Sequence, residues 1–266
     1  MIFRRDKKRR GEPEAEETEE VDTAADTDDD APESSTDDPE TSATAEGLDF
    51  EALDGLEWRE QGPWDIREVD DLDEGDDGPK IDLGSMILTG VPGSELRLQV
   101  AEDTQQIVSA MLIIESRLET DAGSNGAPQT ATSALELGAY AAPRSGNFWA
   151  ELREEISEAA TAAGGSAALN SGPFGVELFR LFPVTTPDGE EGYQPSKMWV
   201  AEGPRWLLRG IVYGQAAIEE SDDAVAVRDV AAAFRKVIVR RDEEAMAPGD
   251  LLPISMPTNL VTEEPS

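Results

Sequence analysis

The sequence predicts an α+β protein in which two long helices pack on a mainly antiparallel sheet, behind a long acidic N-terminal tail. Three observations support this fold class: several segments with alternating apolar residues, two stretches with helical periodicity, and an extreme charge in the first third of the chain. Residues 1–79 hold 30 of the 58 acidic residues and carry −22 of the net charge of −36. Residues 80–266 carry only −14, so the acidity is concentrated near the N-terminus.

The N-terminal tail, residues 1–47, is predicted to be disordered. Its first ten residues are basic, and residues 11–47 contain 16 acidic residues but no Lys, Arg or aromatic residue. Such a segment cannot bury enough apolar surface to offset the entropy lost on ordering. A secretory signal would place an apolar stretch after the basic residues. Because none follows here, we expect a cytoplasmic protein.

Residues 48–79 are predicted to form a docking arm that ends in an acidic linker. Apolar residues recur at roughly helical spacing up to Trp58, and Trp64 follows a Gly-Pro break. Tryptophans are costly to leave in water, so we expect Leu56, Trp58 and Trp64 to pack on the domain. The alternative is that the tryptophans are free to bind a partner. The acidic run 70–77 lacks the ligand spacing of an EF-hand, so no metal site is predicted.

Residues 80–257 are predicted to form the globular domain, and 258–266 a flexible tail. Alternating or β-branched segments predict strands at 81–88, 95–100, 107–118, 134–141, 174–184, 198–201 and 206–213. The third and fourth of these strands form a hairpin with a long loop at 120–132, and the last two form a second hairpin. Residues 248–257 are rich in proline and are expected to be extended.

Two segments have the period of a buried helix face. The first runs from 148 to 163, with Asn147 as the expected N-cap and a Gly-Gly pair after its end. The second begins at Asp222–Asp223 and keeps a 3.6-residue period as far as Arg241, with basic residues near its end. By topology alone, the expected sheet and helices resemble a Mog1/PsbP-like sandwich.

The composition excludes several classes of function. The chain has no Cys and no His, which removes thiolate chemistry, the usual general base and the commonest metal ligand. No phosphate-binding glycine motif is present, so no catalytic residue and no cofactor are predicted. The net negative charge disfavours nucleic acids and anionic membranes as partners. A protein with a basic surface is the partner that we expect.

Loop arginines beside aromatic residues are the main candidates for binding. Arg144 precedes the first predicted helix and lies near Trp149, and helix N-termini bind anions readily. Arg205, Trp206 and Arg209 surround the turn of the second hairpin. One hypothesis is a pocket for a carboxylate or phosphate built from these three arginines. The alternative is internal ion pairing, because Arg is the usual partner in structural pairs and stacks on Trp.

Several motifs together resemble an uncharacterised family found in actinobacteria, domain of unknown function 3710 (DUF3710). The resemblance covers roughly residues 56–257. It rests on Gly62-Pro63-Trp64-Asp65, the Asp-rich turn, Asp82-Leu83-Gly84-Ser85, Ala141 to Ser145, Gly175-Val176-Glu177-Leu178, Gly203 to Trp206, Leu208-Arg209-Gly210 and Leu252-Pro253. The loop at 120–132 and the acidic tail depart from the family pattern. Because the family has no established activity, the resemblance implies an identity and no mechanism.

Three hypotheses for function remain open. The leading one is a non-catalytic cytoplasmic binding or adaptor protein. The second is a sensor or enzyme that uses arginines and carboxylates to handle a small anion. The third is an acidic nucleic-acid mimic or chaperone for a basic partner, in which residues 11–47 and 65–77 imitate phosphates.

Overall fold

The computed structural model describes residues 47–56, 58–70, 72, 78–118, 129–144 and 146–257. These residues belong to one compact unit, 41–266. The predictions for the acidic tail, for most of the loop at 120–132, for most of the acidic run 70–77 and for the C-terminal tail lie outside the described residues. Within the described residues, no helix is long and apolar enough to cross a membrane.

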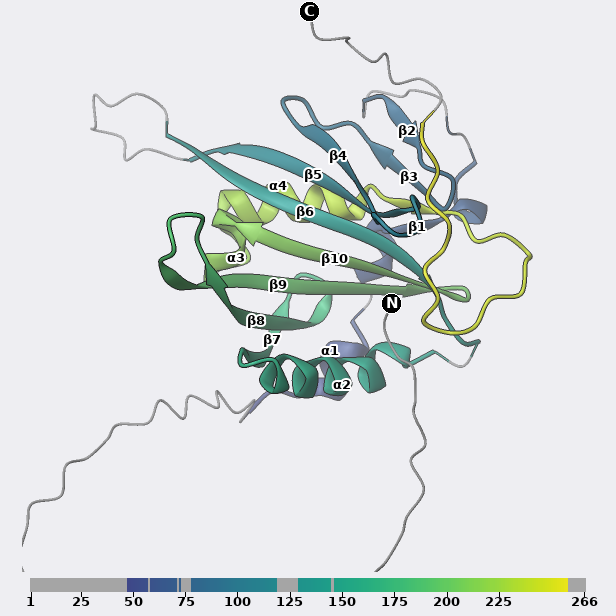
Figure 1. Cartoon of the computed structure of the whole chain (residues 1–266). Coiled ribbons are helices and arrows are strands. Elements are labelled where there is room, and N and C mark those ends of the chain that lie inside the picture. Colours follow the sequence, from purple (N-terminus) through teal and green to yellow (C-terminus); the bar gives the residue numbers. More distant parts are fainter. Residues whose placement is uncertain are drawn as a thin grey trace, which may run out of the picture. The chain divides into compact units, whose positions relative to one another are not determined.

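A seven-stranded sheet forms the centre of this unit (Figure 1), and we call it the large sheet. Its strand order is β4-β5-β6-β10-β9-β8-β7, and all neighbouring strands are antiparallel. The strands are β4 (Glu95–Val100), β5 (Ile107–Arg117), β6 (Thr130–Ala141), β7 (Ser166–Gly172), β8 (Gly175–Thr185), β9 (Glu191–Gly203) and β10 (Trp206–Gly214). The mainly antiparallel α+β fold is therefore confirmed, and so are both hairpins, β5–β6 and β9–β10.

A second, small sheet has the order β1-β11-β3-β2. Its strands are β1 (Trp64–Asp65), β2 (Lys80–Asp82), β3 (Met86–Thr89) and β11 (Ile238–Val239). The single strand predicted at 81–88 is wrong, because Gly84 adopts a positive φ of 81° and the backbone amide of Leu83 donates to the Met86 carbonyl at 2.8 Å. The chain reverses there and forms two antiparallel strands.

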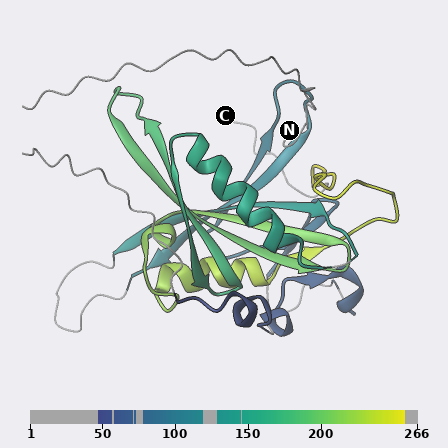
Figure 2. The same cartoon turned by 90° about the horizontal axis from the view of Figure 1, so that it is seen from below.

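The helices lie on opposite faces of the large sheet. α2 (Phe148–Ala162) packs on β7, β8 and β9, and α4 (Val225–Arg235) packs on β5 and β6 from the other face. Figure 2 shows α2 in front of the strands. Two shorter α-helices, α1 (Phe50–Asp54) and α3 (Gln215–Ile218), and two 3-10 helices, η1 (Trp58–Gln61) and η2 (Ile66–Glu68), complete the described elements.

The second predicted helix is shorter than its periodicity indicates. It begins at Val225 and not at Asp222–Asp223, and it ends at Arg235. Beyond it, three consecutive β-branched residues favour extended backbone: the Val237 carbonyl accepts from Trp64, and Ile238 and Val239 form β11. The apolar period continues past Arg235 because Val237 and Val239 belong to the same buried cluster as the residues of α4.

Two clusters of buried apolar residues lie on the two faces of the large sheet. The larger cluster joins the large sheet to α3, α4 and the small sheet, and its centre holds the rings of Phe174, Trp199 and Phe234. The smaller cluster lies under α2 and contains Trp149, Leu178, Met198, Val200, Leu207 and Ile211. One face of the sheet is therefore sealed by a deep core, and the other is covered mainly where α2 lies.

The segment at 58–65 is part of the fold. The Trp206 indole donates to the Asp65 carboxylate at 2.7 Å, and both side chains are almost fully buried. Trp64 is half-buried and its backbone pairs in parallel with β11. The expectation that Leu56 packs on the domain is wrong, because Leu56 is 49% exposed. The side chain of Trp58 lies outside the described part of the chain.

Candidate functional site

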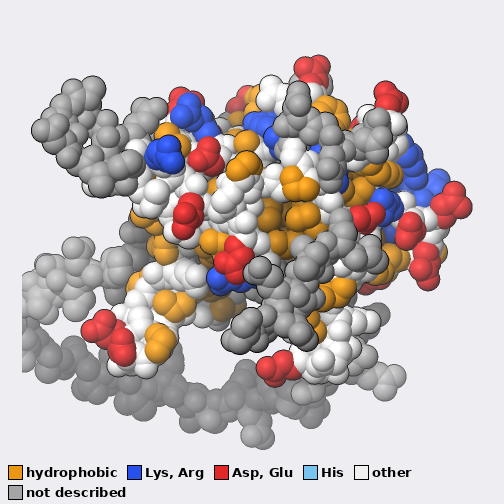
Figure 3. Space-filling view, turned by 90° about the horizontal axis from the view of Figure 1, so that it is seen from above, with side chains coloured by type: hydrophobic (Ala, Val, Ile, Leu, Met, Phe, Trp, Pro, Cys, Tyr) orange, Lys and Arg blue, Asp and Glu red, His pale blue; other side chains and the backbone are white. Residues whose placement is uncertain are grey.

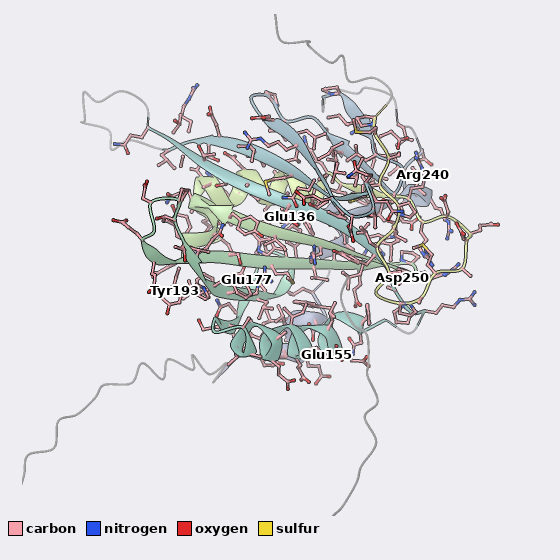
Figure 4. All side chains as sticks on the ribbon, viewed as in Figure 1. Glu136, Glu155, Glu177, Tyr193, Arg240 and Asp250 are labelled. Carbon is pink, nitrogen blue, oxygen red and sulfur yellow. The ribbon has the colours of Figure 1, made fainter. Side chains whose placement is uncertain are left out.

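Five polar side chains gather on the face of the large sheet that carries α2. Glu136 and Tyr140 come from β6, Arg209 and Tyr213 from β10, and Arg180 from β8, and we call them the arginine–tyrosine cluster. Arg209 lies opposite Gly138, between the two β6 side chains. Side chains alternate along a strand, so residues 136, 138 and 140 share one face with Arg209. Figure 4 labels Glu136 on β6.

Glu136 connects three members of the cluster. Its Oε1 lies 3.9 Å from an Arg209 guanidinium nitrogen, and its Oε2 accepts a hydrogen bond from the Tyr213 hydroxyl at 3.2 Å. The Arg209 guanidinium also lies 4.9 Å from the centre of the Tyr140 ring, within range of a cation–π interaction. Gly138 makes this possible, because a Cβ there would lie only 3.1 Å from the Tyr140 hydroxyl oxygen.

Arg180 is the unusual member of the cluster. Its side chain is only 9% exposed, yet it forms no ion pair or hydrogen bond with any described residue, and its Nε is buried without a partner. Its guanidinium lies 5.4 Å from the Phe182 ring. Burial lowers the pKa of Arg180, and the positive charge of Arg209 lowers it further, against the opposing effects of Tyr213 and Glu136. A buried cation without a carboxylate is costly and needs an explanation.

The two tyrosines are neutral at physiological pH and can donate hydrogen bonds; the Tyr213 hydroxyl donates to Glu136. Burial is the main cause that raises the pKa of Tyr140, with Glu136 adding to it and Arg209 opposing it. Burial also raises the pKa of Tyr213, and the charge of Glu136 adds to this effect. Both phenols therefore stay protonated far above physiological pH. The cluster offers two cations, two neutral donors and one carboxylate.

A second buried polar group lies under the other face of the same sheet. The Glu177 carboxylate accepts from the Trp199 indole at 2.7 Å and lies 3.6 Å from Lys197 Nζ, which also donates to the Glu219 carbonyl. Burial raises the pKa of Glu177, and Lys197 and Trp199 oppose this shift. Glu177 and Lys197 are both nearly inaccessible, so their pairing is a structural feature of the core.

The structure places the predicted binding residues at different points. Arg144 is exposed in the loop before α2. Arg205 lies in the β9–β10 turn with a positive φ of 66°, and its carbonyl accepts from Ala142. Trp206 is buried against Asp65, whereas Arg209 lies three residues further along β10 in the arginine–tyrosine cluster. No described interaction joins Arg144 to Arg205 or Arg209.

The N-terminus of α2 already holds a carboxylate. The Trp149 amide donates to the Glu202 side chain at 3.0 Å, and the Trp149 indole donates to the Val176 carbonyl at 3.0 Å. Asn147 occupies the N-cap position, but the prediction that its side chain caps the helix is wrong. Its φ is 63° and its side chain makes no cap hydrogen bond. Glu202, which lies far away in sequence, supplies the acceptor in its place.

Sequence reasoning missed four members of the cluster: Glu136, Tyr140, Arg180 and Tyr213. Their signal in the sequence is weak: Glu136 and Tyr140 share one face of β6, and Arg209 and Tyr213 share one face of β10, but β8 contributes Arg180 alone. It becomes informative only once the register shows that these residues share one face. Among the described residues, no group of three or more acidic side chains could hold a metal ion.

Together these features define an α+β protein whose antiparallel sheet has one sealed face and one partly covered face, on which Arg180 is a buried cation without a partner among the described residues. A family model described as "Protein of unknown function (DUF3710)" matches residues 62–263, and the chain belongs to this family. A comparison with curated proteins gave no match, and a comparison with solved structures gave none either.

Proposed function

We propose that this chain is a binding protein whose arginine–tyrosine cluster recognises an anionic group, a carboxylate or a phosphate. The observation that carries the proposal is Arg180, a cation 9% exposed that pairs with no described carboxylate. Natural proteins seldom bury a charge without a partner, and sites that bind ligands are a common exception. An anion placed beside Arg180 would satisfy it.

The rest of the cluster suits recognition of such a group. Arg209 offers a second guanidinium, and the neutral hydroxyls of Tyr140 and Tyr213 offer hydrogen bonds. On the same face, Met111 lies opposite Glu136, and Met111 and Ile113 are only half-buried. These side chains provide apolar surface for the body of a ligand. The negative charge of Glu136 reduces the electrostatic repulsion between Arg180 and Arg209.

Binding fits the cluster better than catalysis. A general base must gain and lose a proton near neutral pH, and raised pKa values keep both phenols protonated.

Three expectations from the sequence are retained as proposals: an adaptor role, a cytoplasmic location and a protein partner with a basic surface. The face seen in Figure 3 supports the exclusion of nucleic acids, because its described basic side chains are interspersed with acidic ones around an apolar centre. The Mog1/PsbP-like sandwich also remains a proposal for the fold.

The experiment is a calorimetric titration of the full chain with citrate and with inorganic phosphate. We expect Arg180→Met and Arg209→Met to weaken binding by about tenfold or more each, on the scale of a charge-assisted hydrogen bond. Arg144→Met removes an equal charge from an exposed loop and is the matched control, which should bind as the parent does. Failure of both probes to bind, or an equal loss in Arg144→Met, contradicts the proposal.

A further inference from the structure

Strand β7 forms one edge of the large sheet, and its outer side pairs with no other strand of the described residues. It pairs with β8 along its whole length, from Ser166 to Gly172. No other described segment hydrogen-bonds to its backbone. Every second residue of an edge strand directs its backbone N–H and C=O away from the sheet. β7 therefore offers a row of free donors and acceptors seven residues long.

The opposite edge differs in its protection. β4 carries the exposed pair Glu95 and Arg97, joined by a hydrogen bond of 2.9 Å, and charges on an edge discourage further pairing. β7 has the sequence Ser-Ala-Ala-Leu-Asn-Ser-Gly, with no charged residue and no proline. Small neutral side chains allow another backbone to approach closely. Of the two edges of this sheet, only β7 lacks the usual protection.

Helix α2 supplies a charge beside this edge. It packs on β7, and its outer face carries Glu151, Glu154, Glu155 and Glu158, all exposed and none paired with a described residue. Figure 4 places Glu155 on the side of α2 that faces away from the sheet. Alternate side chains of a strand added next to β7 would project toward this helix. Positive side chains there would be attracted by the negative charge that the four glutamates give this helix.

A second copy of the chain fits this edge poorly. Two β7 strands paired about a twofold axis perpendicular to the sheet would place both α2 helices on the same face. Four glutamates from each helix would then approach one another, and like charges oppose such an assembly. The occupant that the charges favour is a foreign, basic segment.

We propose that β7 is a docking edge for an extended basic segment of a partner protein. The segment adds to β7 as an eighth strand of the large sheet, bound through its main chain. Its Lys or Arg side chains on the α2 side lie in the negative field of the four glutamates of that helix, and its other side chains are small or apolar. This site is independent of the arginine–tyrosine cluster, because none of the residues that form it belongs to the cluster.

The test uses the full chain and a synthetic peptide of about seven residues in which Lys alternates with Val, matched in length to β7. Hydrogen exchange is measured at individual amides, so that attraction to the acidic tail is not mistaken for docking. We expect the peptide to slow exchange at alternate β7 amides by about tenfold or more. A peptide with Glu in place of Lys should leave exchange unchanged.

Two pairs of variants distinguish docking at β7 from general attraction to the acidic chain. Glu154→Lys with Glu158→Lys should weaken peptide binding by about tenfold, whereas Glu243→Lys with Glu244→Lys changes the net charge equally in an exposed loop and should act far less. Asn170→Lys on β7 should weaken binding, and Val100→Lys on β4 should not.

Three results overturn the proposal. One is peptide binding that leaves β7 exchange unchanged. Another is equal weakening by the two glutamate pairs, which would indicate only general attraction to an acidic chain. The third is protection of β7 that appears without peptide and grows with protein concentration, which would assign the edge to a second copy.

Discussion

The two faces of the large sheet bury polar groups in different ways. Under α3 and α4, Lys197 has the Glu177 carboxylate and a backbone carbonyl as partners, and Trp206 has Asp65. On the α2 side, Arg180 is buried to a similar degree but has no partner among the described residues. A protein selected for stability alone would not keep such a cation. This comparison supports the proposal that one face stabilises the fold and the other binds a ligand.

The strongest way to break this comparison is to remove Lys197. In Lys197→Met, Glu177 remains buried without its cation, so we expect a loss of about 3 kcal/mol in the free energy of unfolding. Burial already raises the pKa of Glu177, and losing Lys197 raises it further. A carboxyl with a raised folded pKa favours the folded state below its unfolded pKa, and this contribution is lost as pH rises through the folded pKa. The loss should therefore shrink in acid. Urea titrations at two pH values measure it.

Glu177→Gln in the Lys197→Met background is the control for this variant. It removes the uncompensated charge, so it should recover much of the lost stability and abolish the added pH dependence. A loss in Lys197→Met that is equal at both pH values would show that packing, and not charge, dominates at this position.

A second test compares one indole on each face. Trp206→Phe removes the 2.7 Å donor to Asp65 Oδ2 and leaves the buried carboxylate with only the Arg67 amide as a close donor, so we expect a loss of about 2 kcal/mol. Trp149→Phe removes a 3.0 Å hydrogen bond to the neutral Val176 carbonyl under α2, and should cost about 1 kcal/mol. Chemical denaturation of both variants gives the difference. Equal losses would remove the distinction between a sealed and a partly covered face.

Arg209 provides a smaller test on the α2 face. Its pair with Glu136 spans 3.9 Å and both side chains keep some exposure, so Arg209→Met should lower the free energy of unfolding by only about 1 kcal/mol, mainly through the contact with Tyr140. Thermal unfolding measures this loss, with Arg97→Met on β4 as the exposed control. A loss as large as that of Lys197→Met would make Arg209 a structural residue.

Local patterns were enough to predict much of the fold. Alternation located β4, β5, β6, β8 and β10, because half-buried strands keep one face apolar. The same reasoning failed at β7, whose small polar residues alternate only weakly, and at Gly84, where a positive φ splits one apolar run into two strands. The predicted end of the second helix was also wrong, because the apolar residues of the following strand β11 continue the helical period past Arg235.

The candidate site depended on information that no local pattern carries. Arg209 was singled out for its position near a turn, yet its partners are Glu136 and Tyr140 on a strand about 70 residues earlier. Arg180 lies inside an apolar strand and resembles an ordinary surface residue in the sequence. Only the register of β8, β9 and β10 brings it to the cluster. Burial without a partner is a property of the folded chain, so composition and motifs do not reveal it.

The most direct test of the account is the variant Arg180→Met, examined for both stability and binding. Met keeps the apolar stem of the side chain and removes a desolvated charge, so the variant should be as stable as the parent chain or slightly more stable. It should also lose most of its affinity for the anion that the parent binds. One substitution would then preserve or raise the free energy of unfolding and lower the affinity for the anion, a trade-off that is common at binding sites. A variant that is clearly destabilised, yet binds citrate and phosphate as the parent does, would contradict the account.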